Sequence, residues 1–315
     1  RIVTCRPDNE HRDLFLGLPN SYGTLGYALR LVLRTLPVRP FVAIEHRRFD
    51  TAAGFFDAMD SACNDIAADF VDGVVFAADD MVLNVGRFAD SAPSCSDYTY
   101  LDLYWHSLRD KPHDALTTGD WLWRWDTDWF WCSRAFGAQN PTMRRLWPAR
   151  WRRSDVYHRI VGLENRHHVA AAIDRRRGLP ARERVVQDVE IPLERTADFL
   201  DWYLGHVPMT PVWLCPLVGR GEWSLYPLTP GETYVNVGFW GTVPIEPGRR
   251  DGDVNRMVEQ AVADHDGHKS LYSDSYYDEP DFWARYGGDA YRPLKERYDP
   301  AGRLLDLYAK AVGRR

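Results

Sequence analysis

Apolar and polar residues alternate along the chain with periods that predict both strands and helices. Between Ala28 and Pro37, leucines alternate with arginines, which is typical of a strand with one buried face. Around residues 51–68, apolar side chains such as Phe55 and Met59 recur at helical spacing. The order strand–helix–strand–strand, followed by helix–strands–helix, predicts an α+β fold with an antiparallel sheet.

The same patterns place the remaining elements. Further strands are expected at residues 1–7, 41–49, 70–76, 81–85, 185–191, 211–218, 223–227, 233–240 and 271–273, with a hairpin turn at 77–80. Further helices are expected at 13–15, 163–178, 196–204 and 253–264, and in a helical tail over 279–315. The region 90–160 is irregular and rich in aromatic residues.

Composition narrows the class of protein. Thirteen Trp residues indicate a large flat ligand or an apolar cavity, although they also suit a Trp-rich core. A formal net charge of −6 argues against a nucleic-acid binder. The five cysteines are odd in number and form no C-x-x-C pair, so we expect no disulfide framework, no metal site and a reducing, cytoplasmic compartment. No apolar run is long enough to predict a membrane-spanning helix.

The turn at residues 19–27 is a candidate ligand cradle. Its two glycines lie three residues apart, ahead of the strand predicted at 28–37, so backbone N–H groups could approach a flat or anionic ligand. The same spacing also suits an ordinary tight turn. The candidate cofactor-binding residues here are Asn20, Ser21, Gly23, Thr24, Leu25 and Gly26.

Five short motifs carry a family resemblance. They are VVQDVEIP at 185–192, PVWLCPL at 211–217, LYSDSY at 271–276, DFW at 281–283 and YRPLK at 291–295. With the turn at 19–27, they resemble the delta-24-sterol reductase family of vanillyl-alcohol-oxidase-type, FAD-linked oxidoreductases. The similarity covers nearly the whole chain and is weakest at 90–180. Bacterial relatives of this family include a flavoprotein that reduces methylene-branched fatty acyl chains to methyl-branched ones, so the resemblance leaves the substrate open.

The resemblance implies a domain plan. Residues 1–38 would be the C-terminal end of a PCMH-type FAD-binding domain. Residues 39–270 would form a cap domain over the flavin, and residues 271–315 would return to the FAD domain. The N-terminal FAD subdomain, which would hold the pyrophosphate, is absent from this sequence.

A tryptophan cluster at residues 120–131 is the candidate substrate site. In an extended strand its odd positions would form an apolar wall for a hydrocarbon, made by Trp123, Trp125, Trp129 and Trp131. Asp126 and Asp128 would then occupy the other face. A packed sheet face with solvated charges behind it gives the same pattern.

Further candidates follow from the resemblance. It implies that a glutamine, here Gln187, faces the flavin from the cap, with Asp188 beside it. Lys269, Tyr272 and Asp274 surround the segment that would return to the flavin. A lysine there would stabilise the anionic reduced ring by Coulomb attraction. Alternatively, Gln187 could form hydrogen bonds with neighbouring backbone groups, and Lys269 could be an exposed surface residue.

The reduction of a C=C bond, which the family resemblance implies, requires an acid in the active site. An isolated C=C bond has no carbonyl to accept electron density, so protonation to a tertiary cation would precede hydride capture. The candidate acids are Asp126, Asp128 and Asp188, in that order. The function implied is an FAD-dependent reductase of a lipid C=C bond with NADPH as donor. An alcohol or sugar-lipid oxidase of the same superfamily and a truncated, non-catalytic lipid- or partner-binding cap are the alternatives.

A basic stretch at residues 142–153 is the candidate membrane contact. It combines arginines with tryptophans, which suit anionic headgroups and the membrane interface. The residues are Arg144, Arg145, Trp147, Trp151 and Arg152. A solvated basic loop is the alternative. We therefore expect a cytoplasmic protein with membrane association and a lipid substrate.

Overall fold

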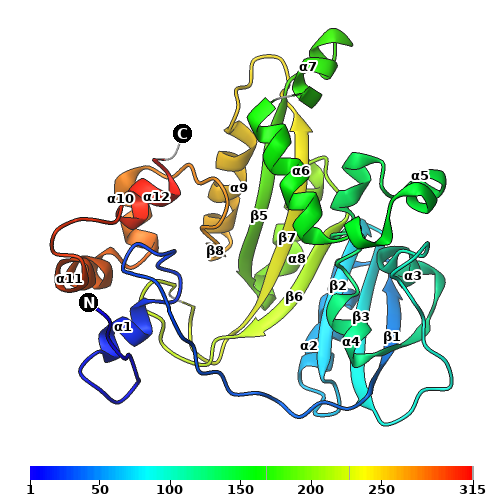
Figure 1. Cartoon of the computed structure of the whole chain (residues 1–315), viewed down its shortest axis with the longest axis horizontal. Helices are drawn as coiled ribbons and strands as arrows, with labels where there is room; N and C mark the ends of the chain where they lie inside the picture. Colours follow the sequence, from blue (N-terminus) through cyan, green and yellow to red (C-terminus); the bar gives the residue numbers. More distant parts are fainter. Residues whose placement is uncertain (168, 227, 314–315) are drawn as a thin grey trace.

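The centre of the molecule is one antiparallel sheet. The computed structural model describes residues 1–167, 169–226 and 228–313. Within them, eight strands lie in the order β4-β1-β3-β2-β6-β7-β5-β8 (Figure 1). They are β1 (Phe41–Phe49), β2 (Phe70–Ala77), β3 (Asp80–Ala89), β4 (His113–Thr117), β5 (Arg182–Pro192), β6 (Val212–Val218), β7 (Thr233–Pro244) and β8 (His268–Lys269). The predicted α+β class with an antiparallel sheet is confirmed.

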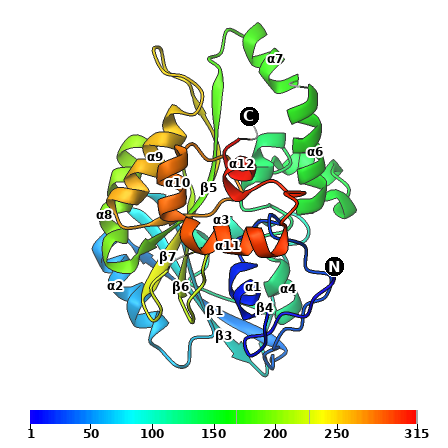
Figure 2. The ribbon, with the colours of Figure 1, turned by 90° about the vertical axis from the view of Figure 1, so that its left-hand side faces the viewer.

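Helices lie around this sheet on both of its faces and at its ends (Figure 2). The longer ones are α2 (Ala52–Cys63), α6 (Ser154–His167), α7 (Val169–Arg176), α8 (Leu193–His206), α9 (Asp253–Asp264) and α11 (Gly288–Tyr298). The shorter ones are α1 (Arg12–Gly17), α3 (Tyr104–Asp110), α4 (Thr118–Trp123), α5 (Pro141–Leu146), α10 (Glu279–Arg285) and α12 (Leu307–Ala311). Two short 3-10 helices are η1 (Cys132–Phe136) and η2 (Ala149–Trp151).

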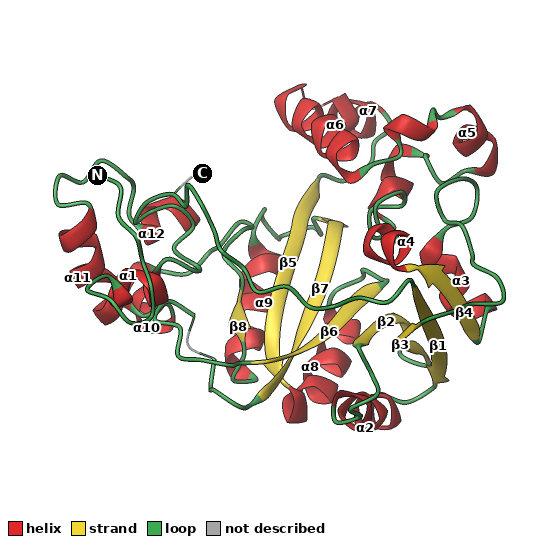
Figure 3. Ribbon diagram, turned by 60° about the horizontal axis from the view of Figure 1, so that its bottom comes forward, coloured by secondary structure: helices red, strands yellow, loops and turns green. Residues whose placement is uncertain are grey.

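Three helices, α2, α8 and α9, cover one face of the sheet. Figure 3 shows α2 and α8 along this face. Alternate residues of β5 and β7, such as Val189 and Val237, pack against helix residues such as Phe55 and Phe199. All four side chains have no exposed surface. Burying side chains of this size stabilises the fold by about 1.5–3 kcal/mol each.

The other face is covered in part by an aromatic insert, residues 98–112 and 118–167. Its Tyr104, Trp121 and Trp125 pack on Val42 and Val82 of the sheet. This layer lies over the end of the sheet that carries β1, β2 and β3. Toward β7 and β5, half-buried residues such as Trp240 remain on this face.

A third cluster joins segments that are far apart in sequence. Leu14 of α1 and Leu25 pack with Phe282, Tyr291 and Leu307 of the last three helices. Hydrogen bonds from Tyr298 to Asp13 at 2.7 Å and from Lys295 to the Thr24 carbonyl at 2.9 Å tie the two segments together. Together, these contacts place the 19–27 turn beside the C-terminal helices.

Two predicted strands are wrong for a shared physical reason. Residues 28–37 form no strand, and Leu29, Leu31 and Leu33 are exposed. Residues 1–7 also form none. A strand needs a neighbour to accept and donate its backbone hydrogen bonds. Among the described residues, no strand lies beside either segment.

The strand predicted at 120–131 is also wrong. The stretch begins inside α4 and continues as turns that lead into η1. Trp129, Phe130 and Trp131 have φ angles of 49°, 49° and 59°, which is left-handed backbone. An extended strand cannot contain such residues.

Smaller corrections concern element ends. The helix predicted over 51–68 ends at Cys63, and Ile66 is fully exposed. Residues 223–226 form no strand, and Pro227 lies outside the described residues. The short strand expected at 271–273 is found at His268–Lys269 instead. The described part of the tail contains α10, α11 and α12 rather than one continuous helix, and residues 314–315 lie outside the described part.

Candidate functional site

The candidate site lies on the face of β5 that points away from α9. Successive residues of a strand point to opposite faces. Gln187 therefore points to the helix face and has no exposed surface, whereas Asp188 points to the other face and is half-buried. Asp188 is thus the one of these two predicted residues that a ligand on the half-buried face could contact.

Asp188 is held by a short hydrogen-bond chain. The Tyr272 hydroxyl donates to Asp188 Oδ2 at 2.5 Å, and Trp240 Nε1 donates to the Tyr272 hydroxyl oxygen at 3.0 Å. Asp188 Oδ1 is buried and has no hydrogen-bond partner among the described residues. Burial raises the pKa of the Asp188 carboxyl, and the Tyr272 hydrogen bond and the nearby Trp240 N–H lower it by less.

A glycine makes room for this arrangement. Gly238 pairs with Asp188 across the β5–β7 ladder. A Cβ atom at Gly238 would lie 2.5 Å from Asp188 Oδ1 and 2.6 Å from the Trp240 ring. Both contacts are well inside van der Waals distance. The absence of a side chain at Gly238 therefore lets the carboxyl and the indole lie side by side.

A second acid, Glu190, follows on the same face. Asn236 Nδ2 donates to Glu190 Oε1 at 2.7 Å, and the Tyr226 hydroxyl donates to Oε2. Burial, together with the nearby charge of Asp188, raises the pKa of Glu190 to about 8. Glu190 is therefore mainly protonated at neutral pH. No sequence motif had singled out Glu190, although its spacing of two from Asp188 in a strand places both residues on one face.

Aromatic rings from three segments adjoin this acid pair. The Phe130 ring lies 5.1 Å from Trp240 and 5.5 Å from Trp213, and the Trp131 ring lies 5.9 Å from Trp240. Trp240 therefore contacts both the aromatic rings and Tyr272. Left-handed backbone at non-glycine residues costs about 1–3 kcal/mol each, so packing must hold the 129–131 turn in place.

The four predicted substrate-binding tryptophans do not share one face. Trp125 and Trp131 are 7% and 3% exposed and pack over the sheet, whereas Trp123 is 69% exposed. The Trp129 ring instead stacks on Tyr157 of α6 at 5.9 Å. Of the four, Trp131 is the one whose ring contacts Trp240.

The two remaining candidate acids have different surroundings. Asp126 Oδ1 accepts hydrogen bonds from the Ser154 hydroxyl at 2.6 Å and the Ser154 N–H at 3.2 Å, which fixes the start of α6. Asp128 has no exposed surface, and burial raises the pKa of its carboxyl to about 7. Nearby N–H groups and Arg144 lower this pKa by less than burial raises it. Neither of its oxygens has a hydrogen bond of ordinary geometry among the described residues.

The 19–27 turn reaches the site through Tyr22. Asn20, Tyr22 and Gly23 have φ angles of 60°, 50° and 75°. The Tyr22 hydroxyl oxygen accepts a hydrogen bond from Leu271 N–H at 2.9 Å, next to Tyr272. Burial raises the pKa of Tyr22, as do the charges of Glu190 and Asp188. The turn, the 268–274 segment and the sheet face therefore meet at this point, and no local pattern had singled out Tyr22.

The other turn residues mainly hold the turn itself. The Ser21 and Thr24 hydroxyls donate to the Leu18 and Ser21 carbonyls, both at 2.7 Å. Leu25 is buried in the cluster with the C-terminal helices. At Gly26, an added Cβ would meet no atom within 4 Å.

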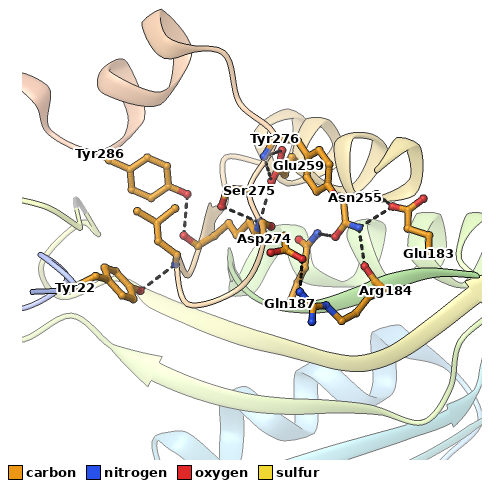
Figure 4. A network of polar contacts seen from close by, with 12 residues as sticks. Tyr22, Glu183, Arg184, Gln187, Asn255, Glu259, Asp274, Ser275, Tyr276 and Tyr286 are labelled. Atoms are coloured by element: carbon orange, nitrogen blue, oxygen red, sulfur yellow. Dashed lines mark hydrogen bonds and ion pairs between the residues drawn. The ribbon is translucent and has the colours of Figure 1, made fainter. Parts of the chain in front are cut away.

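Lys269 and Gln187 belong to a buried polar network under α9 (Figure 4). Lys269 Nζ lies 2.8 Å from Glu259 Oε1, and neither side chain is more than 4% exposed. Gln187 Nε2 donates to Asn255 Oδ1 at 2.6 Å. Because β8 pairs Lys269 with Val189, the lysine points to the same face as Val189 and away from Asp188.

Asp274 is engaged in a surface ion pair. Its carboxylate lies 2.5 Å from an Arg184 Nη atom, and both side chains are about half exposed, at 46% and 50%. Such a pair contributes about 0–1 kcal/mol to stability. Its main consequence is that the Arg184 charge near this face is matched by a carboxylate.

The residues on the Asp188 face fit a planar heteroaromatic ring. Trp213, Trp240 and Tyr272 offer flat surfaces on which such a ring could stack, and the Trp213 and Trp240 ring centroids lie 6.2 Å apart. Two cations of β8 and β5, Lys269 and Arg184, are paired with Glu259 and Asp274. The described residues thus fit the ring better than an anionic phosphate.

The described residues lack two other kinds of feature. No group of three or more His, Cys, Asp or Glu side chains there has the geometry of a metal site. Within the same residues, every helix is too short or too polar to cross a bilayer.

Comparison with known proteins places the chain among its relatives. No known protein-family model matches it. The chain is 24% identical to the Delta(24)-sterol reductase of Homo sapiens over 335 aligned positions, which cover 98% of this chain. It is 22% identical to the Delta(24)-sterol reductase of Arabidopsis thaliana over 366 positions, again covering 98% of the chain. Over nearly its whole length, the chain is thus similar to Delta(24)-sterol reductases.

This relationship confirms the family resemblance of the sequence motifs. A Delta(24)-sterol reductase homolog of Caenorhabditis elegans is 24% identical over 290 positions, or 85% of this chain. The chain spans about 60% of the length of the curated relatives it matches: 60% of the human and 61% of the Arabidopsis Delta(24)-sterol reductase. The β5 strand with Asp188 and the 268–274 segment lie within the residues compared with the human protein.

Proposed function

We propose that this chain forms the substrate-covering part of an FAD-dependent reductase of a lipid C=C bond. The substrate would be a sterol side chain or a methylene-branched fatty acyl chain, with NADPH as the electron donor. The observation that carries the proposal is the Asp188 face. There, a carboxyl with a raised pKa adjoins aromatic rings in a relative of the Delta(24)-sterol reductases.

Asp188 is the residue that we assign as the proton donor. An isolated alkene must gain a proton at one carbon before the other carbon can accept hydride, and this proton requires a desolvated acid. Tyr272 holds Asp188 Oδ2, so Oδ1 is the oxygen that can carry the proton to the alkene. Desolvation keeps the carboxyl protonated to a higher pH than an exposed aspartate.

Aromatic rings would stabilise the cation that protonation creates. The faces of Trp213, Trp240 and Phe130 adjoin one another at 5.1–6.2 Å between ring centroids. A cation over a desolvated ring gains about 1–2 kcal/mol. The same rings exclude water, which would otherwise capture the cation.

A bound flavin would supply the hydride that completes the reduction. Tyr22, Tyr272 and Trp240 are the side chains that we expect to lie against its ring. Glu190, protonated near neutral pH, adds little negative charge beside it. These four residues belong to the 19–27 turn, the 268–274 segment, β7 and β5.

The proposal is tested on the complete protein that carries this chain. A flavin spectrum after purification, anaerobic bleaching by NADPH, and a gain of two hydrogens by an unsaturated sterol or methylene-branched acyl lipid are expected. Bleaching by an alcohol substrate without a response to NADPH would instead assign an oxidase. Absence of flavin together with lipid binding would leave a non-catalytic cap.

A further inference from the structure

The predicted basic contact divides into two kinds of arginine. Arg144 and Arg152 are 1% and 3% exposed. Arg152 donates from its guanidinium to the carbonyls of Trp147, Tyr100 and Arg144 at 2.7–3.1 Å. These two arginines brace the aromatic insert from within and cannot reach a membrane.

The surface around them is strongly cationic. Residues 141–177 contain ten arginines and three acidic residues, a formal charge of +7, whereas the whole chain carries −6. Eight of the ten arginines are exposed: Arg145, Arg150, Arg153, Arg159, Arg166, Arg175, Arg176 and Arg177. We call these exposed residues, with the apolar side chains among them, the α5–α7 surface. In Figure 1, α6 lies beside β5 and β7, and α7 projects beyond the end of the sheet.

Exposed apolar side chains lie among these charges. Leu146 is 74% exposed, Leu163 58% and Trp151 48%. Monomer surfaces commonly show single exposed apolar residues, but three within 18 positions of an arginine-rich segment form an amphipathic surface. Such a surface has no partner within the described chain.

A pocket opens in the middle of the α5–α7 surface. It has a volume of about 540 Å³ and lies between Trp147, Trp151 and the first turns of α6, where it includes Val156 and Ile160. Arg150, Arg153 and Arg159 also line it. The Trp147 indole donates to the Trp151 carbonyl at 3.2 Å, which ties the Trp147 ring to the backbone at Trp151. An apolar pocket lined by cations suits an amphiphile with an anionic head.

We propose that the α5–α7 surface docks on a bilayer that contains anionic lipids. Arginines would contact the phosphate headgroups, while Trp151 and Leu146 would enter the interfacial layer. Nucleic acid also attracts arginine, but its backbone offers nothing to bury Leu146 and Leu163. Charge and exposed apolar side chains together therefore favour a lipid surface. The surface is separate from the Asp188 face, so this proposal does not depend on the proposed reaction.

The test is sedimentation of the complete protein with vesicles. Neutral phosphatidylcholine vesicles are compared with vesicles that contain roughly 30% phosphatidylglycerol. We expect binding to the anionic vesicles and an at least tenfold weaker partition coefficient for Arg145→Glu/Arg150→Glu. Leu146→Ser should weaken binding without changing the charge. None of these substitutions touches buried Arg144 or Arg152.

The matched control carries the same charge change elsewhere. Arg30→Glu/Arg34→Glu alters two exposed arginines of the 28–37 segment, and its binding should fall less than threefold. Circular dichroism and thermal unfolding verify that each variant is folded. Equal losses in both double variants, no binding of the wild type to anionic vesicles, or tighter binding to duplex DNA that Arg145→Glu/Arg150→Glu abolishes would each overturn the proposal.

Discussion

Gln187 and Asp188 are consecutive in β5, yet Gln187 hydrogen-bonds to Asn255 of α9 whereas Asp188 hydrogen-bonds to Tyr272 on the opposite face of the sheet. The family resemblance had implied that Gln187 faces the flavin, with Asp188 beside it. In a strand, two adjacent residues cannot serve one ligand on one face. The structure therefore assigns Gln187 to the support of α9 and leaves Asp188 for chemistry.

Asp188→Asn removes the acidic group but nearly keeps the shape of the side chain. We expect alkene reduction by the complete protein to fall by at least 100-fold, because general acid catalysis contributes about 10²–10⁴-fold. Reduction of the flavin by NADPH should be unchanged. Asp126→Asn is the matched control, since Asp126 fixes the start of α6, and it should retain most activity in stopped-flow and product assays. Activity of Asp188→Asn equal to the wild type would remove Asp188 from the role.

Glu190→Gln tests the pH dependence of stability. With a folded-state pKa of about 8 and an ordinary value of 4.5, Glu190 holds its proton in the folded state while the unfolded chain has lost it. Its stabilising contribution is complete below the ordinary pKa and is lost as pH rises through about 8. Urea unfolding at about pH 7 and about pH 8.5 should show a fall in the wild type. The free energy of unfolding of the variant should fall by less between these two pH values. Equal falls in the two proteins would contradict this.

Gly238→Ala should disturb the Asp188 face directly. The new methyl group would displace Asp188 or Trp240, so we expect about 1–3 kcal/mol of destabilisation, a change in tryptophan fluorescence and loss of activity. Gly205→Ala in α8 is the control, because its methyl group meets no atom within 4 Å. It should stabilise the protein by about 0.4–1 kcal/mol. Unchanged unfolding of Gly238→Ala would argue against the described packing.

Lys269→Met should destabilise the fold, because it leaves the buried Glu259 carboxylate without its cation. Breaking a buried pair in this way costs about 3–5 kcal/mol. Chemical denaturation measures the loss, and Lys269→Met/Glu259→Gln should recover part of it. If Lys269 instead served the flavin, the single variant would remain stable and alter the flavin absorption spectrum.

Local patterns predicted the elements whose partners are also described. The strand 41–49 and the helix 253–264 are found at those residues, because alternation and helical spacing are local properties. The segments 28–37 and 120–131 had equally regular patterns. The first has no neighbouring strand among the described residues, and the second turns back in left-handed backbone at Trp129–Trp131. Strand pairing depends on residues far away in sequence, and a single pattern does not contain it.

The candidate site was predictable to a similar extent. Asp188 and Tyr272 were named from the sequence, and the structure joins them by a hydrogen bond. Lys269 was named for its charge, but its direction depends on the β5–β8 pairing. Tyr22 contacts Leu271 across 249 positions of sequence. No local spacing reports such a contact, which is why Tyr22 was not foreseen.

The cluster that joins α1 to the C-terminal helices has a consequence for synthesis of the protein. Asp13 accepts a hydrogen bond from Tyr298, which lies 285 residues later in the chain. At roughly 5–20 residues per second, a ribosome needs about 15 to 60 seconds to add that length. During this interval Leu14 and Leu25 lack the C-terminal helices that pack against them in the folded protein, so the growing chain exposes this apolar surface until those helices have been made.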